Sequence, residues 1–309
     1  MNNTGISEEV KSFSRMVKEE IFRIDEENMC CIKAEFSGIL LFGAQKIKKD
    51  GISLITENPS VLGAFVSLAR SLGLEFEVHQ NTEKSIKYTA KISDTVLVAQ
   101  ILYDLNLLDE GTGEVCCRLS AQTLQKLCCR RAFLRGAFLG AGVLSDPNKN
   151  YNLEIVTHCE QLCDELLGLL KSLDFEFKKV FRRNKYVLYL KNSEQIADLL
   201  SFLGAYKSQM ELINIKIEKE IRNDVNRAAN SETSNLIKTI NASVEQIQAI
   251  QKIDKMIGLE SLPDDLREIA LLRLENKDLS LSELGGLLNP PLTKSGVNHR
   301  MKKIMAYID

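Results

Sequence analysis

Eight cysteines are the residues of this sequence with the most evident capacity for metal or disulfide chemistry. They occur as Cys30-Cys31, Cys116-Cys117, Cys128-Cys129, and Cys159 with Cys163. Adjacent side chains point apart on a strand and diverge by about 100° on a helix, so each adjacent pair alone is a poor chelator. Cys159 and Cys163 have helical spacing, but no second CxxC-like half follows them. We therefore expect small, buried, reduced side chains, no structural metal and no cofactor.

Polar and basic residues near the carboxyl end have the spacing of one helix face. Val297, Met301, Ile304 and Ile308 form an apolar stripe at i, i+4, i+7 and i+11. The opposite face carries Lys294, Ser295, Asn298, His299, Lys302 and Lys303, with Arg300 beside it. Residues 277–303 contain five Lys or Arg against Asp278 and Glu283, although the whole chain has a formal charge of −2. This local excess suits contact with phosphates.

Three helices within residues 261–308 are expected to position that face. Pro263 lies in the first turn of the first helix, Ser282 caps the second, and Thr293 caps the third after the break at 289–291. A helix, a short helix, a turn and a basic helix form the layout of a helix-turn-helix DNA reader. It resembles the promoter-reading region of bacterial sigma factors. The alternative is a three-helix bundle that binds protein.

The helix-turn-helix layout assigns a role to each of these side chains, because a recognition helix enters the major groove by its amino end. We expect Lys294, Ser295, Asn298 and His299 to approach base edges. Arg300, Lys302 and Lys303 should favour phosphates. Ser282 and Thr293, at the starts of their helices, complete the expected DNA-binding set.

A second basic segment, FKKVFRRNKYVLYLK (177–191), is predicted to form a pair of strands. Its basic side chains are Lys178, Lys179, Arg182, Arg183 and Lys185, with aromatic residues between them. A basic β-ribbon suits phosphate contact, so this is a candidate second surface for DNA or for a partner. An ordinary solvated hairpin has the same charge pattern, and charge alone leaves both interpretations open.

An internal repeat organises the first two thirds of the chain. Residues 52–78 match residues 153–179, and residues 35–44 match residues 133–142 in the same order. Each copy is predicted to form an apolar helix with small residues, a strand, a second helix and two further strands. The prediction is an α+β fold made of two related halves.

This arrangement resembles the LAGLIDADG homing endonuclease fold, in which two such halves pair through glycine-spaced helices and their sheets form a saddle over DNA. Gly38, Gly136 and Gly140 suit the helix crossing, as do Gly43 and Gly142. The resemblance places the acidic metal ligands of the family at the positions of Gly43 and Ala141. Neither residue can bind Mg²⁺, which requires oxygen ligands, so we expect no catalytic residue in the helix pair.

The combination of a degenerate LAGLIDADG-like domain and a carboxyl-terminal helix-turn-helix resembles the bacterial WhiA family over nearly the whole chain. The matching segments are RRAFLRGAFLGAGVLSDP, LEIVTHCEQLCDELLGLL, NRAANSETSNLIKT and SLSELGGLLNPPLTKSGVNHRMKKI. The resemblance implies a DNA-binding regulator of sporulation, or of cell division and chromosome segregation. The expected domains are residues 1–210 (repeat 1 about 28–95, repeat 2 about 130–205), a helical linker over 211–255, and the helix-turn-helix over 256–309.

These observations predict a non-enzymatic protein whose partner is double-stranded DNA, with a transcription factor or RNA polymerase as a second partner. A metal-dependent endonuclease with unorthodox ligands and a protein-interaction adaptor remain the alternatives. The opening residues lack the pattern of a signal peptide, and no apolar stretch approaches the roughly 20 residues that cross a bilayer. We expect a cytoplasmic, nucleoid-associated protein with no membrane contact and no small-molecule substrate.

Overall fold

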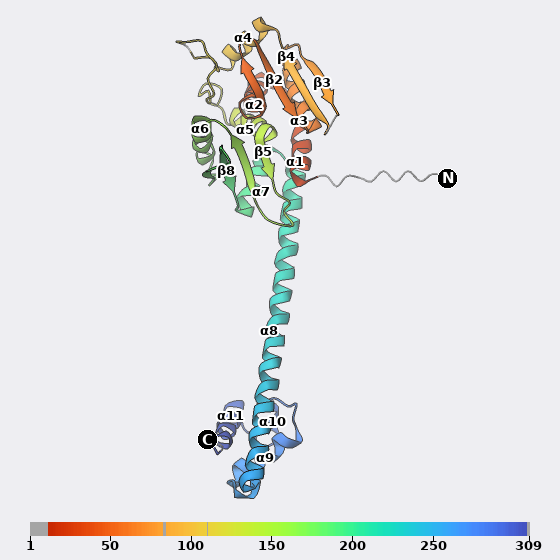
Figure 1. Cartoon of the computed structure of the whole chain (residues 1–309), viewed down its shortest axis with the longest axis vertical. Helices are drawn as coiled ribbons and strands as arrows, with labels where there is room; N and C mark the ends of the chain where they lie inside the picture. Colours follow the sequence, from red (N-terminus) through yellow and green to blue (C-terminus); the bar gives the residue numbers. More distant parts are fainter. Residues whose placement is uncertain (1–11, 83–84, 110, 308–309) are drawn as a thin grey trace, which may run out of the picture. The chain divides into compact units, whose positions relative to one another are not determined.

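The computed structural model describes residues 12–82, 85–109 and 111–307. The chain divides into two compact units, Met1–Glu218 and Lys219–Asp309. The division falls inside one long helix, α8 (Tyr206–Ile257), which contains the residues expected to form a helical linker (Figure 1).

The first unit contains the same order of elements twice: a helix, two strands, a helix, two strands and a helix. The first copy consists of α2 (Met29–Gly43), β1 (Ala44–Lys48), β2 (Gly51–Thr56), α3 (Pro59–Ser71), β3 (Glu77–Asn81), β4 (Lys87–Ile92) and α4 (Thr95–Asp104). The second consists of α5 (Leu127–Ala141), β5 (Gly142–Leu144), β6 (Leu153–Thr157), α6 (Glu160–Lys171), β7 (Lys178–Arg182), β8 (Lys185–Leu190) and α7 (Ser193–Leu203). Strands β1 and β5 were not predicted, because each follows its helix directly with no turn to mark the change.

Each copy forms a four-stranded antiparallel sheet, in the orders β1-β2-β4-β3 and β5-β6-β8-β7. Side chains alternate across a strand, so each sheet has two faces. One face is buried in the core of the unit and carries Ile52, Leu54, Ala90 and Ile92 in the first sheet, and Leu153, Ile155, Leu188 and Leu190 in the second. The expected α+β class is confirmed.

Helices α2 and α5 lie side by side at the centre of this unit (Figure 1). A Cβ atom at Gly38 would overlap the carbonyl oxygen of Phe133, and one at Gly136 would overlap that of Glu35. A Cβ atom at Gly43 would lie 2.9 Å from the Cα of Gly140. The expected glycine crossing is confirmed for these four positions. Gly142 is different, because it ends α5 and a Cβ there would meet Phe138 of the same helix.

Helix α1 (Phe13–Phe22) was not anticipated from the sequence, since it lies outside both repeats. Phe13, Val17 and Ile21 form its buried stripe, with the spacing of successive helical turns. The helix packs against α3 and α5. It therefore touches both copies of the repeat.

The second unit contains α8 from Lys219 onward, a short 3-10 turn (Leu259–Ser261), α9 (Asp264–Glu275), α10 (Leu281–Gly286) and α11 (Lys294–Met305). Its own hydrophobic core joins all these elements: Ile250, Ile253, Leu259, Leu262, Leu266, Ile269, Ala270, Leu284, Leu288, Val297, Met301 and Ile304.

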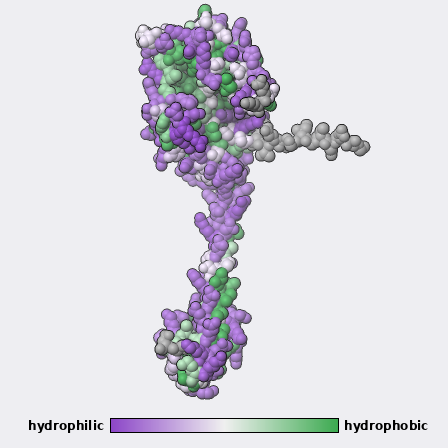
Figure 2. All heavy atoms as spheres, in the orientation of Figure 1, coloured by the Kyte–Doolittle hydropathy of each residue, from purple (hydrophilic) through white to green (hydrophobic). Residues whose placement is uncertain are grey.

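Apolar side chains are also exposed along α8. Leu236, Ile240 and Val244 recur at one-turn intervals with Ile237 next to them, and Figure 2 shows hydrophobic residues at the surface of this helix. Within the described part of the chain, no helix has both the length and the apolar character needed to span a membrane.

Candidate nucleic-acid interface

Helix α11 is held in place by its apolar stripe. Val297, Met301 and Ile304 are buried in the core of the second unit, whereas Ile308 lies outside the described residues. The Oγ1 of Thr293 accepts a hydrogen bond from the backbone N–H of Gly296 at 3.3 Å. Thr293 is therefore the N-cap of α11, as predicted.

The starts of α9 and α10 correct two expectations. Ser280, not Ser282, caps α10: its Oγ accepts from the N–H of Glu283 at 3.3 Å, and the Glu283 carboxylate accepts from the N–H of Ser280 at 2.7 Å. This capping box needs a glutamate three residues after the cap, and Ser282 has Gly285 there. Ser282 instead lies exposed in the first turn of α10. Pro263 precedes α9 as its N-cap rather than lying in its first turn.

The turn between α10 and α11 depends on a glycine. A Cβ atom at Gly285 would overlap the carbonyl oxygen of Leu292 and lie 3.1 Å from the Cγ2 of Val297. The N–H of Leu292 also donates to the carbonyl of Gly285 at 2.9 Å. These contacts fix the approach of the supporting helix to α11.

Arg273 braces the loop before α10, and sequence reasoning missed it. Its side chain is buried, and its Nη1 donates to the carbonyl of Leu279 at 2.6 Å. Ser243 of α8 donates to the carbonyl of Lys277 at 2.5 Å. Burial lowers the pKa of Arg273. Arginine side chains usually lie at the surface, so the sequence gives no sign that this one is buried. Only the loop carbonyl groups around it in the fold show that it stabilises the loop.

The predicted DNA-contacting face of α11 is exposed. Lys294, Ser295, Asn298, His299, Lys302 and Lys303 are all exposed, as are Ser282 and Thr293. Within residues 12–82, 85–109 and 111–307, the three lysines of this face form no ion pair. Arg300 differs, because it is half-buried and its Nε lies 3.6 Å from the Asp265 carboxylate of α9. It holds α11 to α9 and has less freedom to reach a phosphate.

The second basic segment divides between the two faces of its sheet. Strand alternation places Lys178, Arg182 and Lys185 on the face away from the core. Lys179 lies on the other face, where its Nζ is 2.6 Å from Asp164 and 3.0 Å from Glu160 of α6. Lys179 therefore does not join the open surface predicted from the sequence.

The open face of this sheet is basic but partly neutralised. Arg182 pairs with the Glu154 carboxylate of β6. Among the described residues, Lys178, Arg183 and Lys185 form no ion pair. A groove of about 390 Å³ is lined by Val156, Arg182, Arg183, Lys185 and Val187. This surface has the charge for a second contact, although it is smaller than the sequence indicated.

Gly43 and Ala141 lie at the carboxyl ends of α2 and α5, and their side chains have no oxygen atom that could bind a metal. Lys18 of α1 instead donates from its Nζ to the carbonyl of Leu139 at 2.9 Å, two residues before Ala141. Burial lowers the pKa of Lys18 to about 8, so the amine is still mostly protonated at neutral pH. A cation at this end of the helix pair disfavours the binding of Mg²⁺.

A buried ion pair lies at the middle of the helix pair. Arg135 of α5 contacts Glu35 of α2 at 2.9 Å and Glu26 at 2.7 Å. Burial raises the pKa of Glu35 to about 7, although the charge of Arg135 opposes this. The carboxylate is thus occupied by a partner within the protein.

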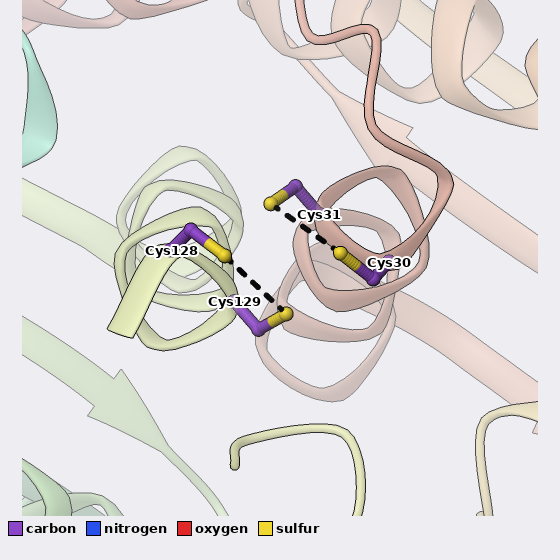
Figure 3. Close-up of side chains that lie close together, drawn as sticks. All are labelled: Cys30, Cys31, Cys128 and Cys129. Atoms are coloured by element: carbon purple, nitrogen blue, oxygen red, sulfur yellow. Dashed lines mark hydrogen bonds between the residues drawn. The ribbon is translucent and has the colours of Figure 1, made fainter. Parts of the chain in front are cut away.

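The cysteines differ from the expectation of small buried side chains. Cys31, Cys129 and Cys163 are buried, whereas Cys30, Cys117 and Cys128 are exposed. Each adjacent pair alone remains poorly placed to chelate an ion. In the fold, the pairs from α2 and α5 face one another (Figure 3).

Comparison with known proteins identifies the family. The family model described as WhiA LAGLIDADG-like domain matches residues 130–222, and that described as WhiA C-terminal HTH domain matches residues 225–308. The chain is 40% identical over 307 residues to "Probable cell division protein WhiA" of Alkaliphilus metalliredigens (strain QYMF), covering 95% of this chain and 96% of that protein. The chain belongs to the WhiA family.

Other WhiA proteins agree with this assignment. A protein of the same name from Ruminiclostridium cellulolyticum is 40% identical over 302 residues, covering 95% of this chain and 96% of that protein. The crystal structure of full-length DUF199/WhiA from Thermatoga maritima superposes with a TM-score of 0.60 at 29% identity, over 96% of this chain and 98% of that chain. The WhiA relatives are named as cell division proteins and not as enzymes. All nine residues of the expected DNA-binding set lie within the WhiA helix-turn-helix match.

Proposed function

We propose that the protein binds double-stranded DNA through α11 and acts without catalysis in cell division and chromosome segregation. The observation that carries the proposal is the exposed polar face of α11, whose opposite face is locked into a hydrophobic core. A recognition helix needs this combination, because side chains that read bases must be held in a fixed position.

We assign a different role to each end of α11. Lys294, Ser295, Asn298 and His299 lie toward its amino end and approach base edges in the major groove. Lys302 and Lys303 lie one to two turns further on and contact phosphates. The exposed basic face of the second sheet supplies a second DNA contact or a docking site for a transcription factor or RNA polymerase.

The relatives are named cell division proteins, and these names support the proposed role in cell division. A helix-turn-helix protein of this kind acts on the chromosome, either by regulating transcription or by occupying chromosomal sites directly. Mapping bound sites across the genome and comparing them with expression changes in a deletion strain distinguishes these two modes.

Site selection from a random DNA pool tests the α11 assignment. Asn298→Ala should change the preferred sequence and reduce discrimination at one base position by about 1–3 kcal/mol. Lys303→Ala should weaken all sites alike and lower the slope of log affinity against log salt by about one. Lys255→Ala, which removes an exposed lysine of α8, is the matched control and should leave both unchanged. The proposal would be contradicted if both α11 variants kept the sequence preference and the salt dependence of the wild type.

A plasmid-nicking assay with Mg²⁺ or Mn²⁺ tests the absence of catalysis. The positions of Gly43 and Ala141 offer no carboxylate to hold a catalytic metal, so we expect no nicked product. Cleavage that a chelator abolishes, and that copurifies with the full chain, would favour the endonuclease alternative.

A further inference from the structure

Four thiols meet where the amino ends of α2 and α5 lie side by side. Cys30 and Cys31 belong to the first turn of α2, and Cys128 and Cys129 belong to the first turn of α5 (Figure 3). All four Sγ atoms lie within 4.8 Å of one another. The two pairs occupy corresponding positions of the repeat, so the duplication brings together two half-sites that are each incomplete.

The spacing of the sulfur atoms matches tetrahedral coordination. The Sγ atoms of Cys30 and Cys31 are 3.9 Å apart, and those of Cys128 and Cys129 are 4.0 Å apart. A Zn–S bond of about 2.3 Å gives a tetrahedron with an edge of about 3.8 Å. A disulfide requires about 2.05 Å between its sulfur atoms. The thiols are therefore placed to surround an ion with only small movements.

Burial disfavours the thiolate at Cys31 and Cys129 and raises the pKa of both thiols, so a bound metal ion must itself displace their protons. Neither Asn28 nor Lys126, the N-cap residues of the two helices, makes a side-chain cap, and the cluster lies at the positive ends of both helix dipoles. Two acidic side chains of this region are paired with cations, Glu26 with Arg135 at 2.7 Å and Asp104 with Lys33 at 2.8 Å. Helix N-termini stabilise thiolates, which are the form that binds a metal.

The four-cysteine cluster is open to solvent on one side and enclosed by protein on the other. Cys30 and Cys128 are exposed, and Cys30 and Cys129 line a cavity of about 190 Å³ with Lys33 and Lys126. Cys31 and Cys129 are buried, with 1% and 3% of their surface exposed. An ion can enter from the exposed side and acquire four protein ligands, as in structural rather than catalytic zinc sites.

We propose that Cys30, Cys31, Cys128 and Cys129 form a tetrahedral site for a thiophilic divalent cation of the Zn²⁺ class. Binding forms four metal–sulfur bonds and releases the four thiol protons to solvent, with no change of oxidation state. The ion joins the two copies of the repeat at the amino ends of the helix pair. Gly43 and Ala141 lie at the opposite ends of these 15-residue helices, about 20 Å away at 1.5 Å per residue. The site is thus separate from the positions that would hold catalytic metals in a nuclease.

Titration of the reduced, metal-free full chain with Co²⁺ tests this site. We expect one Co²⁺ per chain, with the intense ligand-field and sulfur-to-cobalt charge-transfer bands of tetrahedral thiolate coordination, and displacement of Co²⁺ by Zn²⁺. Alkylation followed by mass spectrometry should then show the four cluster cysteines protected and Cys116 and Cys117 still reactive.

Variants of two exposed ligands test the site, and a variant of another adjacent cysteine pair is the control. Cys30→Ser and Cys128→Ser should each lower Co²⁺ affinity by at least about 100-fold, because even outer-shell partners of a metal are worth about 10–100-fold. The double variant Cys116→Ser/Cys117→Ser also removes an adjacent pair and should bind normally. Circular dichroism checks that all variants fold. The proposal would be overturned if the folded wild type showed no thiolate bands, or if only the control variant lost them. It would also be overturned if the cysteines formed disulfides without taking up metal.

Discussion

Arg135 is a buried cation whose removal should destabilise the helix pair in a pH-dependent way. Its side chain is 6% exposed, and it serves two carboxylates, Glu35 with a side chain 9% exposed and Glu26 with one 18% exposed. Arg135→Met keeps most of the volume and removes the charge, which leaves Glu35 buried without a partner. Breaking a buried pair in this way costs about 3–5 kcal/mol, a large part of the roughly 5–15 kcal/mol that holds a typical protein folded.

The pH dependence follows from Glu35. Its pKa in the folded protein is about 7, above its usual value of 4.5, because burial disfavours the carboxylate. A raised pKa adds stability at low pH, and that stability is lost as pH rises from about 4.5 through 7. Without Arg135 the pKa of Glu35 should rise further. The variant should therefore lose more stability at about pH 8 than at about pH 5, where the carboxyl is protonated.

Urea unfolding followed by tyrosine fluorescence measures this difference. The chain has no tryptophan, and six of its seven tyrosines lie in the first unit, so the signal reports mainly on the unit that contains the pair. The double variant Glu35→Gln/Arg135→Met removes both charges of the more buried pair and leaves only Glu26, whose side chain is 18% exposed. It should recover most of the loss. Equal destabilisation at both pH values, or no recovery in the double variant, would refute the reasoning.

Three further changes test other contacts. Lys18→Met should raise the free energy of unfolding near neutral pH, and this gain should fade as pH rises from about 8 to about 10.5. The reason is that a lysine whose pKa is lowered by burial costs stability only while its amine is charged. Urea midpoints measured across this pH range test the prediction. Gly136→Ala should lower the free energy of unfolding by about 1–3 kcal/mol or more, since the new Cβ meets a backbone carbonyl, whereas Gly168→Ala, with nothing within 4 Å, should be neutral or stabilising. Ser280→Ala should cost about 0.5–2 kcal/mol of stability in thermal melts, and Ser282→Ala almost nothing.

The features predicted well from sequence are those encoded by local pattern or by repetition. The duplication, the crossing glycines, the three carboxyl-terminal helices and the cap of α11 at Thr293 all leave periodic or positional signals. The cap of α10 was misplaced by two residues because Ser280 and Ser282 flank Leu281, and either serine suits the start of a helix. Only the reciprocal bond with Glu283 distinguishes them.

The features that were missed depend on contacts between distant segments. Lys179 has the same charge as Lys178, but strand parity turns it toward carboxylates of α6 that are 15 and 19 residues away in sequence. Lys18 and Arg273 lie in ordinary helical positions, and only the fold surrounds them with carbonyl groups. The thiol cluster needs two helices that start about 100 residues apart, so no spacing rule for a single segment finds it.

The most direct test of DNA reading by α11 is site-specific photo-crosslinking. A photoreactive amino acid replaces Asn298 on α11 in one variant and Lys185 on the open face of the second sheet in another, each in the full chain bound to a selected DNA site. We predict that position 298 crosslinks to a defined base within the preferred site and that excess specific DNA competes the product away. Crosslinks from position 185 alone, with none from position 298, would contradict the account.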